Sequence, residues 1–172
     1  ILLTHSHYDH VLGTPYILKR YPEAKVVAGS YAAHIFTKES ARATMRRLDN
    51  SCAAGYGITE YDDLIDDLRV DITVDDGDLV KCGDMAFRII GLPGHTKCSI
   101  GFYMEDRGIL LGTETIGVYF GDDRYLPSCL VGYNMSLDSI EKVKKLEIEG
   151  MVLPHYGYVD KEGASRYLER SE

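Results

Sequence analysis

The segment that most constrains this chain is residues 5–10, which read H-S-H-Y-D-H and directly follow an apolar run typical of a buried strand end. His5 and His7 lie two residues apart in an extended loop, so their side chains can point the same way and bind one metal ion. Asp9 and His10 can then turn toward a second ion. Imidazole nitrogen suits zinc and iron, whereas carboxylate oxygen suits harder ions. The segment, which we call the histidine motif, therefore predicts a metal site.

Two further histidines stand in loops of the kind that complete such a site. His95 follows a predicted strand within a Gly/Pro-rich loop, and His155 does the same near the end of the chain. A catalytic metal needs ligands from distant segments and an open position for water, so both residues are candidate ligands. The one histidine outside these places, His34, falls within a predicted helix, and we interpret it as structural.

Composition argues against several classes of protein. The chain has 172 residues, enough for a domain with a core, and a net charge of −8 at pH 7. Nucleic-acid binding relies on clustered Lys and Arg, and the densest basic run, residues 42–47, reads as a solvated helix face, so we expect no nucleic-acid partner. No apolar run reaches roughly 18 residues, so we expect no membrane partner. The cysteines form no C-x-x-C pair, and free thiols favour a cytoplasmic protein.

Apolar periodicity and turn residues predict a mixed order of strands and helices. The predicted helices lie at 11–21, 30–47 with an extension to 52, 60–68, 136–147 and 161–170. The predicted strands lie at 1–4, 24–28, 70–74, 79–81, 85–90, 99–104, 108–112 and 151–153, and residues 113–133 read as a long loop. This order favours a layered α/β fold with helices outside the sheets. Strands that end near positions 4, 90, 111 and 153 would each deliver a polar ligand to one edge.

Four short segments of the chain resemble the metallo-β-lactamase superfamily, in particular its glyoxalase II-like hydrolases. They are T-H-S-H-Y-D-H-V-L-G at 4–13, P-G-H-T-K-C-S at 93–99, L-L-G-T-E-T at 110–115 and P-H-Y-G at 154–157. The first is highly specific and the second fairly so, and the resemblance covers the whole chain. It implies a single domain over residues 1–172 with an αββα sandwich fold and metals at one edge, between the two sheets.

The resemblance also implies a ligand set for two metal ions. The residues that match the family's ligands are His5, His7, Asp9, His10, His95, Glu114 and His155. The first ion would take His5, His7 and His95, and the second would take Asp9, His10 and His155. In the family the bridging carboxylate is an aspartate at a strand end, and Glu114, one methylene longer, is the best match here. A structural role for Glu114 away from the metals is the alternative.

The family normally has several strands before its first motif, and this sequence lacks them. The resemblance thus implies an N-terminally incomplete domain. If residues 1–172 were the whole molecule, apolar sheet edges would be exposed. Under that condition we expect poor solubility or assembly with another chain, for example as a homo-oligomer.

These features predict a metal-dependent hydrolase of an ester, thioester or lactone that acts on a small molecule. Two divalent ions roughly 3.5–4 Å apart lower the pKa of a bridging water, and the resulting hydroxide would attack the carbonyl. Asp9 would both bind metal and orient this nucleophile, so it is the candidate catalytic residue. Zinc is the expected metal, with iron and manganese as alternatives.

The substrate is less constrained than the chemistry. Tyr119, Tyr133 and Tyr156 are candidate substrate-binding residues, because hydroxyls near a metal pair can bind a carbonyl or an oxyanion. Packing of loops onto the sheet is the alternative role for each of them. No basic cluster follows Ser136, which disfavours a glutathione thioester. Two other functions stay open: a small-molecule phosphodiesterase or nuclease, and a non-catalytic or redox metal-binding module.

Overall fold

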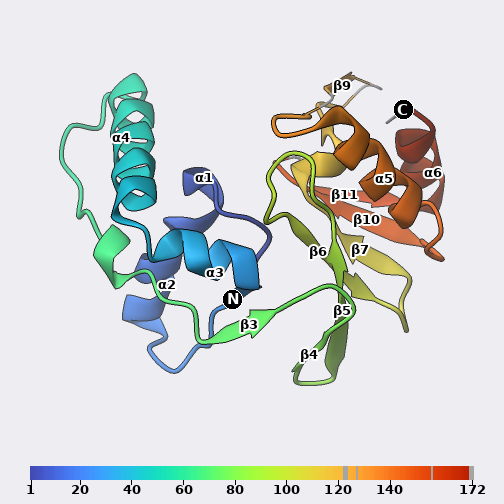
Figure 1. The fold of residues 1–172 in the computed structure, drawn as a ribbon, viewed down its shortest axis with the longest axis horizontal. Coiled ribbons are helices and arrows are strands. Elements are labelled where there is room, and N and C mark those ends of the chain that lie inside the picture. Colours follow the sequence, from blue (N-terminus) through green and yellow to red (C-terminus); the bar gives the residue numbers. More distant parts are fainter. Residues whose placement is uncertain (122–123, 127, 156, 171–172) are drawn as a thin grey trace. The chain divides into compact units, whose positions relative to one another are not determined.

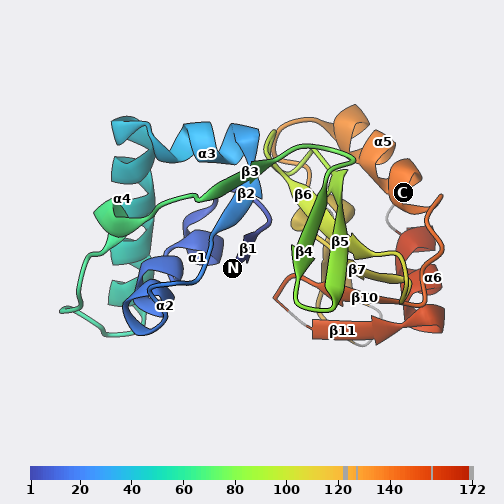
Figure 2. The same cartoon turned by 90° about the horizontal axis from the view of Figure 1, so that it is seen from below.

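The computed structural model describes residues 1–121, 124–126, 128–155 and 157–170 (Figures 1 and 2). The chain divides into two compact units, residues 1–73 and residues 74–172. That these residues form one domain stays a prediction. Among the described residues, no helix is both long enough and apolar enough to cross a membrane.

The first unit combines a small sheet with four α-helices. Its strands are β1 (Leu2–Leu3), β2 (Val27–Gly29) and, at the boundary between the units, β3 (Ile72–Val74), in that order across the sheet, and β1 and β2 are parallel. Its helices are α1 (Tyr8–Val11), α2 (Thr14–Arg20), α3 (Ser30–Phe36) and α4 (Glu39–Gly55), with a 3₁₀ turn η1 (Ile65–Asp67). The predicted strands near 1–4, 24–28 and 70–74 are confirmed, and the helix predicted over 11–21 forms as α2 from Thr14 to Arg20.

The single helix predicted over residues 30–47 is wrong, because the chain breaks between α3 and α4. Lys38 is extended, with φ −85° and ψ 122°. The hydroxyl of Thr37 donates a hydrogen bond to the carbonyl oxygen of His34 at 2.8 Å. Nε of Arg42 donates to the carbonyl oxygen of Phe36 at 2.6 Å. The last carbonyls of α3 are thus satisfied by side chains, and the helix can end there.

The acidic helix predicted over residues 60–68 is also wrong, and only η1 forms there. The carboxylates of this segment pair with α4 instead. Arg46 forms ion pairs with Asp63 and with Asp66, the latter at 3.1 Å. The basic run on α4, predicted to be a solvated face, therefore holds the acidic segment.

The second unit is built on a six-stranded sheet in the order β11-β10-β7-β6-β5-β4. The strands are β4 (Leu79–Cys82), β5 (Met85–Gly91), β6 (Ile100–Met104), β7 (Ile109–Leu111), β10 (Gly150–Leu153) and β11 (Gly157–Asp160). β6 is antiparallel to both β5 and β7, and β7 is parallel to β10. β5, β7 and β10 therefore run in one direction, and their carboxyl ends lie at one edge of the sheet. This confirms the shared edge for three of the four predicted strands, those that end near positions 90, 111 and 153. The strand that ends near position 4 belongs to the other sheet.

Helices α5 (Tyr133–Val143) and α6 (Lys161–Arg170) lie beside this sheet (Figure 1), and they bury one apolar cluster with it. The cluster includes Leu110, Met151, Ile140, Val143 and Leu168, all of them buried. The segment predicted as a loop over 113–133 carries a 3₁₀ turn η2 (Glu114–Ile116) and a small hairpin of β8 (Val118–Tyr119) and β9 (Tyr125–Leu126). α5 starts at Tyr133, three residues before the predicted start at Ser136.

Candidate metal centre

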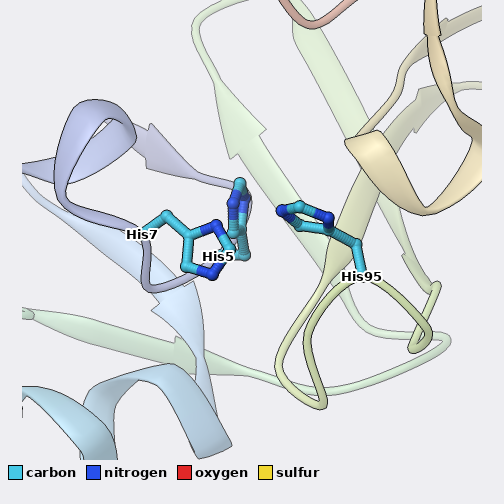
Figure 3. A group of neighbouring side chains, drawn as sticks. All are labelled: His5, His7 and His95. Carbon is cyan, nitrogen blue, oxygen red and sulfur yellow. The ribbon is translucent and has the colours of Figure 1, made fainter. Parts of the chain in front are cut away.

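The histidine motif folds as a bend followed by one helical turn. Because α1 begins at Tyr8, Asp9 and His10 project from a helix, whereas His5 and His7 project from the bend before it. The ring of His5 lies beside that of His7 (Figure 3), with their centroids 4.7 Å apart, and its centroid is 4.5 Å from that of His10. A carboxylate oxygen of Asp9 lies 3.4 Å from Nε2 of His10. The motif thus brings its candidate metal ligands close to one another.

The second unit brings its candidate ligands together from three strand ends. His95 lies on the loop after β5 (Figure 3), Glu114 opens η2 after β7, and His155 follows β10. Nε2 of His155 is 3.1 Å from Oε1 of Glu114, and the Glu114 side chain is buried. Two of the three predicted ligands are therefore in direct contact, although their positions in the chain are far apart.

His155 adopts a backbone conformation that non-glycine residues avoid. Its φ is 67°, and no other non-glycine residue in the described part of the chain has a positive φ. The left-handed region costs an L-residue roughly 1–2 kcal/mol. Such strain concentrates at functional sites, where surrounding structure holds it. The strained residue is the one that contacts Glu114, which is consistent with a ligand role.

A hydroxyl contacts Nδ1 of one histidine in each unit. Oγ1 of Thr4 lies 3.1 Å from Nδ1 of His5. In the second unit, Nδ1 of His95 lies 2.7 Å from Oγ of Ser128 and 3.0 Å from its carbonyl oxygen. Such a partner holds the ring in place through Nδ1, and Nε2 is then the nitrogen through which the histidine can bind a metal. Neither residue was among the predicted site residues. Thr4 could have been found from its place beside the motif, whereas nothing in the sequence signals Ser128.

The donor set in each unit fits a divalent transition metal. The first unit offers three imidazoles and a carboxylate, and the second offers two imidazoles and a carboxylate. A carboxylate as buried as that of Glu114 is costly unless it is paired or binds a cation. Histidines held through Nδ1 are typical of metal-bound imidazole. Nitrogen and carboxylate donors together suit zinc, iron and manganese.

The predicted substrate-binding tyrosines have different surroundings. Tyr119 packs against Tyr167 of α6, with ring centroids 6.1 Å apart. Tyr133 is exposed at the first position of α5. Tyr156 lies outside the described residues. A substrate role for these tyrosines stays a prediction.

Comparison with known proteins gives a family match over most of the chain. Residues 1–155 match the family model described as the metallo-beta-lactamase superfamily. A hydroxyacylglutathione hydrolase from Francisella tularensis subsp. novicida is 27% identical over 159 residues, which is 92% of this chain and 49% of the relative. The chain thus spans about half the length of the curated relatives that it matches.

Solved structures share the fold. An archaeal metallo-beta-lactamase superfamily protein from Sulfolobus tokodaii aligns with a TM-score of 0.75 at 24% identity, covering 98% of this chain and 66% of that one. A variant of a flavo di-iron protein from Thermotoga maritima aligns with a TM-score of 0.65 at 22% identity, covering 99% of this chain and 41% of that one. At these identities the likeness concerns the fold alone, and it confirms the predicted fold class.

Proposed function

Because the chain belongs to the metallo-β-lactamase superfamily, we propose that it is a metal-dependent hydrolase of an ester, thioester or lactone. One observation carries the proposal. Each unit gathers within itself the donors that the family's motifs require: the histidine motif in the first unit, and strand-end ligands in the second, where His155 lies 3.1 Å from Glu114. By the family's motifs, both sets would serve one pair of metal ions.

The proposed division of ligands follows the family's motifs. One ion would be held by His5, His7 and His95, and the other by Asp9, His10 and His155. Glu114 would be the carboxylate shared by the two ions. The contact of His155 with Glu114 supports this role, since it places the carboxylate beside a proposed ligand. Thr4 and Ser128 hold the rings of His5 and His95 through Nδ1.

When bound, a pair of divalent ions activates water for attack near neutral pH and polarises the carbonyl of the substrate. Asp9 accepts a hydrogen bond from the attacking water and so orients it toward the carbonyl carbon. This role suits Asp9 because its carboxylate projects from the single turn of α1, in contact with His10. With water as the nucleophile, the reaction uses no serine or cysteine nucleophile.

The proposal names a class of reaction and a small set of metals. The name of the Francisella relative denotes a hydrolase of a glutathione conjugate, which favours acyl transfer to water as the reaction. Zinc is the proposed metal, and iron and manganese are the alternatives. Because the Thermotoga neighbour is named a di-iron protein, the reconstitution experiment should include iron.

The test combines metal content with a substrate panel. The chain is reconstituted with zinc, iron or manganese, and metal per chain is measured by mass spectrometry. Hydrolysis is then assayed with p-nitrophenyl esters, thioesters, lactones and bis-p-nitrophenyl phosphate. We expect two ions per chain and ester, thioester or lactone turnover that His5→Ala and Asp9→Ala abolish.

His34→Ala is the matched control for the histidine variant, because His34 lies on α3 outside the proposed ligand set. It should leave metal content and turnover unchanged. Turnover of the phosphodiester alone would overturn the proposed reaction in favour of a phosphodiesterase. Less than one ion per chain after reconstitution would overturn the metal centre itself.

A further inference from the structure

The first unit contains a groove that the proposed chemistry does not use. It has a volume of about 410 Å³, within the range of small-molecule sites. Four tyrosines line it, Tyr8, Tyr16, Tyr56 and Tyr61, and we call it the tyrosine groove. They come from α1, from α2, and from the segment that follows α4. All lining residues belong to the first unit.

The groove begins at a proposed metal ligand. Asp9 is one of its lining residues, next to Tyr8 on the same helical turn. From there the lining passes Leu12 and reaches Ala53 on α4. A group that occupies the groove therefore lies next to the side chain that orients water in the proposed reaction.

Two of the four tyrosine hydroxyls in the lining donate hydrogen bonds to residues outside the groove. The hydroxyl of Tyr16 donates to the carbonyl oxygen of Asp62. The hydroxyl of Tyr61 donates to Oδ1 of Asn50 at 2.6 Å. Partial burial, followed by the Asp49 carboxylate, raises the pKa of Tyr61 to about 12, so this hydroxyl stays neutral. These tyrosines thus offer ring surface rather than hydroxyls to a ligand.

The charges of the lining are of one sign. Asp9 and Asp49 are its charged residues, and no Lys or Arg is among the described residues that line it. Asp9 is a proposed metal ligand, so its charge is offset when metal is bound. Asp49 then remains as the charged residue of the lining, and it disfavours a ligand carboxylate by like-charge repulsion.

A second groove of the first unit lies toward the start of α4 and differs from the tyrosine groove in the charge of its lining. Its volume is about 420 Å³, and it begins at His7 rather than at Asp9. Its lining includes the cation Lys38 together with the apolar side chains of Ile35, Met45 and Leu48. Through Lys38, this groove can pair with an anionic part of a substrate. The difference in charge assigns an uncharged part of the substrate to the tyrosine groove.

We infer that the tyrosine groove binds the uncharged, apolar acyl chain of the substrate and selects against acyl chains that end in a carboxylate. The inference rests on the proposed hydrolase and names the class of ester that this enzyme cleaves. Apolar chain burial gives the affinity, at about 0.8 kcal/mol per methylene. Repulsion between Asp49 and a terminal carboxylate gives the selection against charged acyl chains.

Gly13 allows the groove to be narrowed without strain. It lines the groove, its φ is −70°, and a Cβ added there meets no atom within 4 Å. Gly55, at the end of α4, has equally open surroundings but does not line the groove, so Gly55→Leu is the matched control for Gly13→Leu. With p-nitrophenyl 5-methylhexanoate, Gly13→Leu should lower kcat/KM about tenfold, as expected if roughly two methylenes lose their burial. With the acetate, and for Gly55→Leu with either ester, the change should stay within about twofold.

Charge selection is tested with the glutarate monoester, which places a carboxylate where 5-methylhexanoate has its methyl groups. Asp49→Lys should raise kcat/KM for this ester about fivefold relative to the neutral one. Glu39→Lys makes the same charge change at the exposed start of α4 and should leave the ratio unchanged. Equal ratios in the two variants would overturn the assignment of Asp49.

A binding measurement separates this inference from the proposed hydrolase. The neutral fluorophore prodan is titrated into the metal-free protein, and Gly13→Leu should weaken its binding severalfold while Gly55→Leu does not. Tyr56→Ser, at a side chain that is 81% exposed, provides a second variant with little risk to folding, and it should weaken binding about twofold. Hydrolysis of esters without any effect of Gly13→Leu or Tyr56→Ser would overturn the acyl groove and leave the hydrolase standing. Variant-sensitive prodan binding without ester hydrolysis would support the apolar groove and overturn the hydrolase.

Discussion

The two units supply candidate ligands in opposite ways. In the first unit, one stretch of six residues provides four donors, and a single turn of helix arranges them. In the second unit, three donors come from the ends of β5, β7 and β10, between positions 95 and 155. The first set depends on local backbone conformation, and the second depends on the register and direction of a whole sheet. Perturbations of packing should therefore affect the second set far more than the first.

The largest expected difference concerns two glycines that each lie beside a ligand segment. Gly94 precedes His95 with a φ of 149°, and a Cβ there would overlap Oγ of Ser136 and come within 2.7 Å of Cγ2 of Thr115. Gly94→Ala should lower the free energy of unfolding by about 3 kcal/mol, from overpacking and backbone strain together. Urea denaturation measures it.

Gly13→Ala is the control in the first unit, where a Cβ meets no atom within 4 Å. It should cost less than about 1 kcal/mol. Similar losses of unfolding free energy in the two alanine variants would contradict this comparison. They would show that packing does not constrain the second ligand set more than the first.

The next prediction compares ligands that differ in burial. Glu114→Gln removes a buried charge, so the metal-free protein should keep its stability or gain some. The stabilisation added by zinc should shrink by at least about 1.4 kcal/mol, which corresponds to tenfold weaker binding. Thermal unfolding with and without zinc gives both quantities.

His10→Gln is the counterpart on the partly buried motif, and it should lose zinc stabilisation without changing the metal-free protein. If Glu114→Gln kept the full effect of zinc, Glu114 would have a structural role away from the metals.

The two ligand sets also differ in how much of each could be predicted from the sequence. The histidine motif needed no folded context, because its donors are neighbours in the chain. His95 and His155 were predictable as residues after strands, and the shared edge followed once those strands were placed. Ser128 was not predictable, because its contact with His95 depends on how a loop 33 positions away folds back. The break between α3 and α4 depends likewise on one side chain, Arg42, which reaches back to a carbonyl.

A smaller effect is expected for the hydroxyls that hold the histidine rings. Thr4→Val removes the hydroxyl next to Nδ1 of His5, and zinc affinity should fall about tenfold. Ser128→Ala should cost less, because the Ser128 carbonyl oxygen, 3.0 Å from Nδ1 of His95, remains. Isothermal titration with zinc measures both affinities. A larger loss for Ser128→Ala than for Thr4→Val would show that its hydroxyl, and not the carbonyl, fixes the ring.

The smallest expected effect is a pH-dependent contribution from one carboxylate in each unit. The carboxylate of Asp71 accepts a hydrogen bond from the amide N–H of Val26 at 2.8 Å, and this bond is the main reason why the pKa of Asp71 is lowered. Burial alone would raise the pKa of Asp76, but the Gly91 amide at 2.7 Å and the Lys142 ammonium hold it below its ordinary value. A carboxyl whose pKa is lower in the folded state stabilises the fold above its unfolded pKa, about 4. That contribution is lost as the pH falls through the folded pKa.

Asp71→Asn and Asp76→Asn should therefore be less stable than the parent chain at pH 7, and the differences should close below about pH 3. For Asp76, which is about half exposed, the loss at pH 7 should stay below about 1 kcal/mol. Asp84→Asn removes the same charge at an exposed turn and serves as the control. Urea midpoints across this pH range test the prediction. A difference that persists at pH 3 would mean that the asparagine perturbs packing, and that these carboxylates do not stabilise their units through charge.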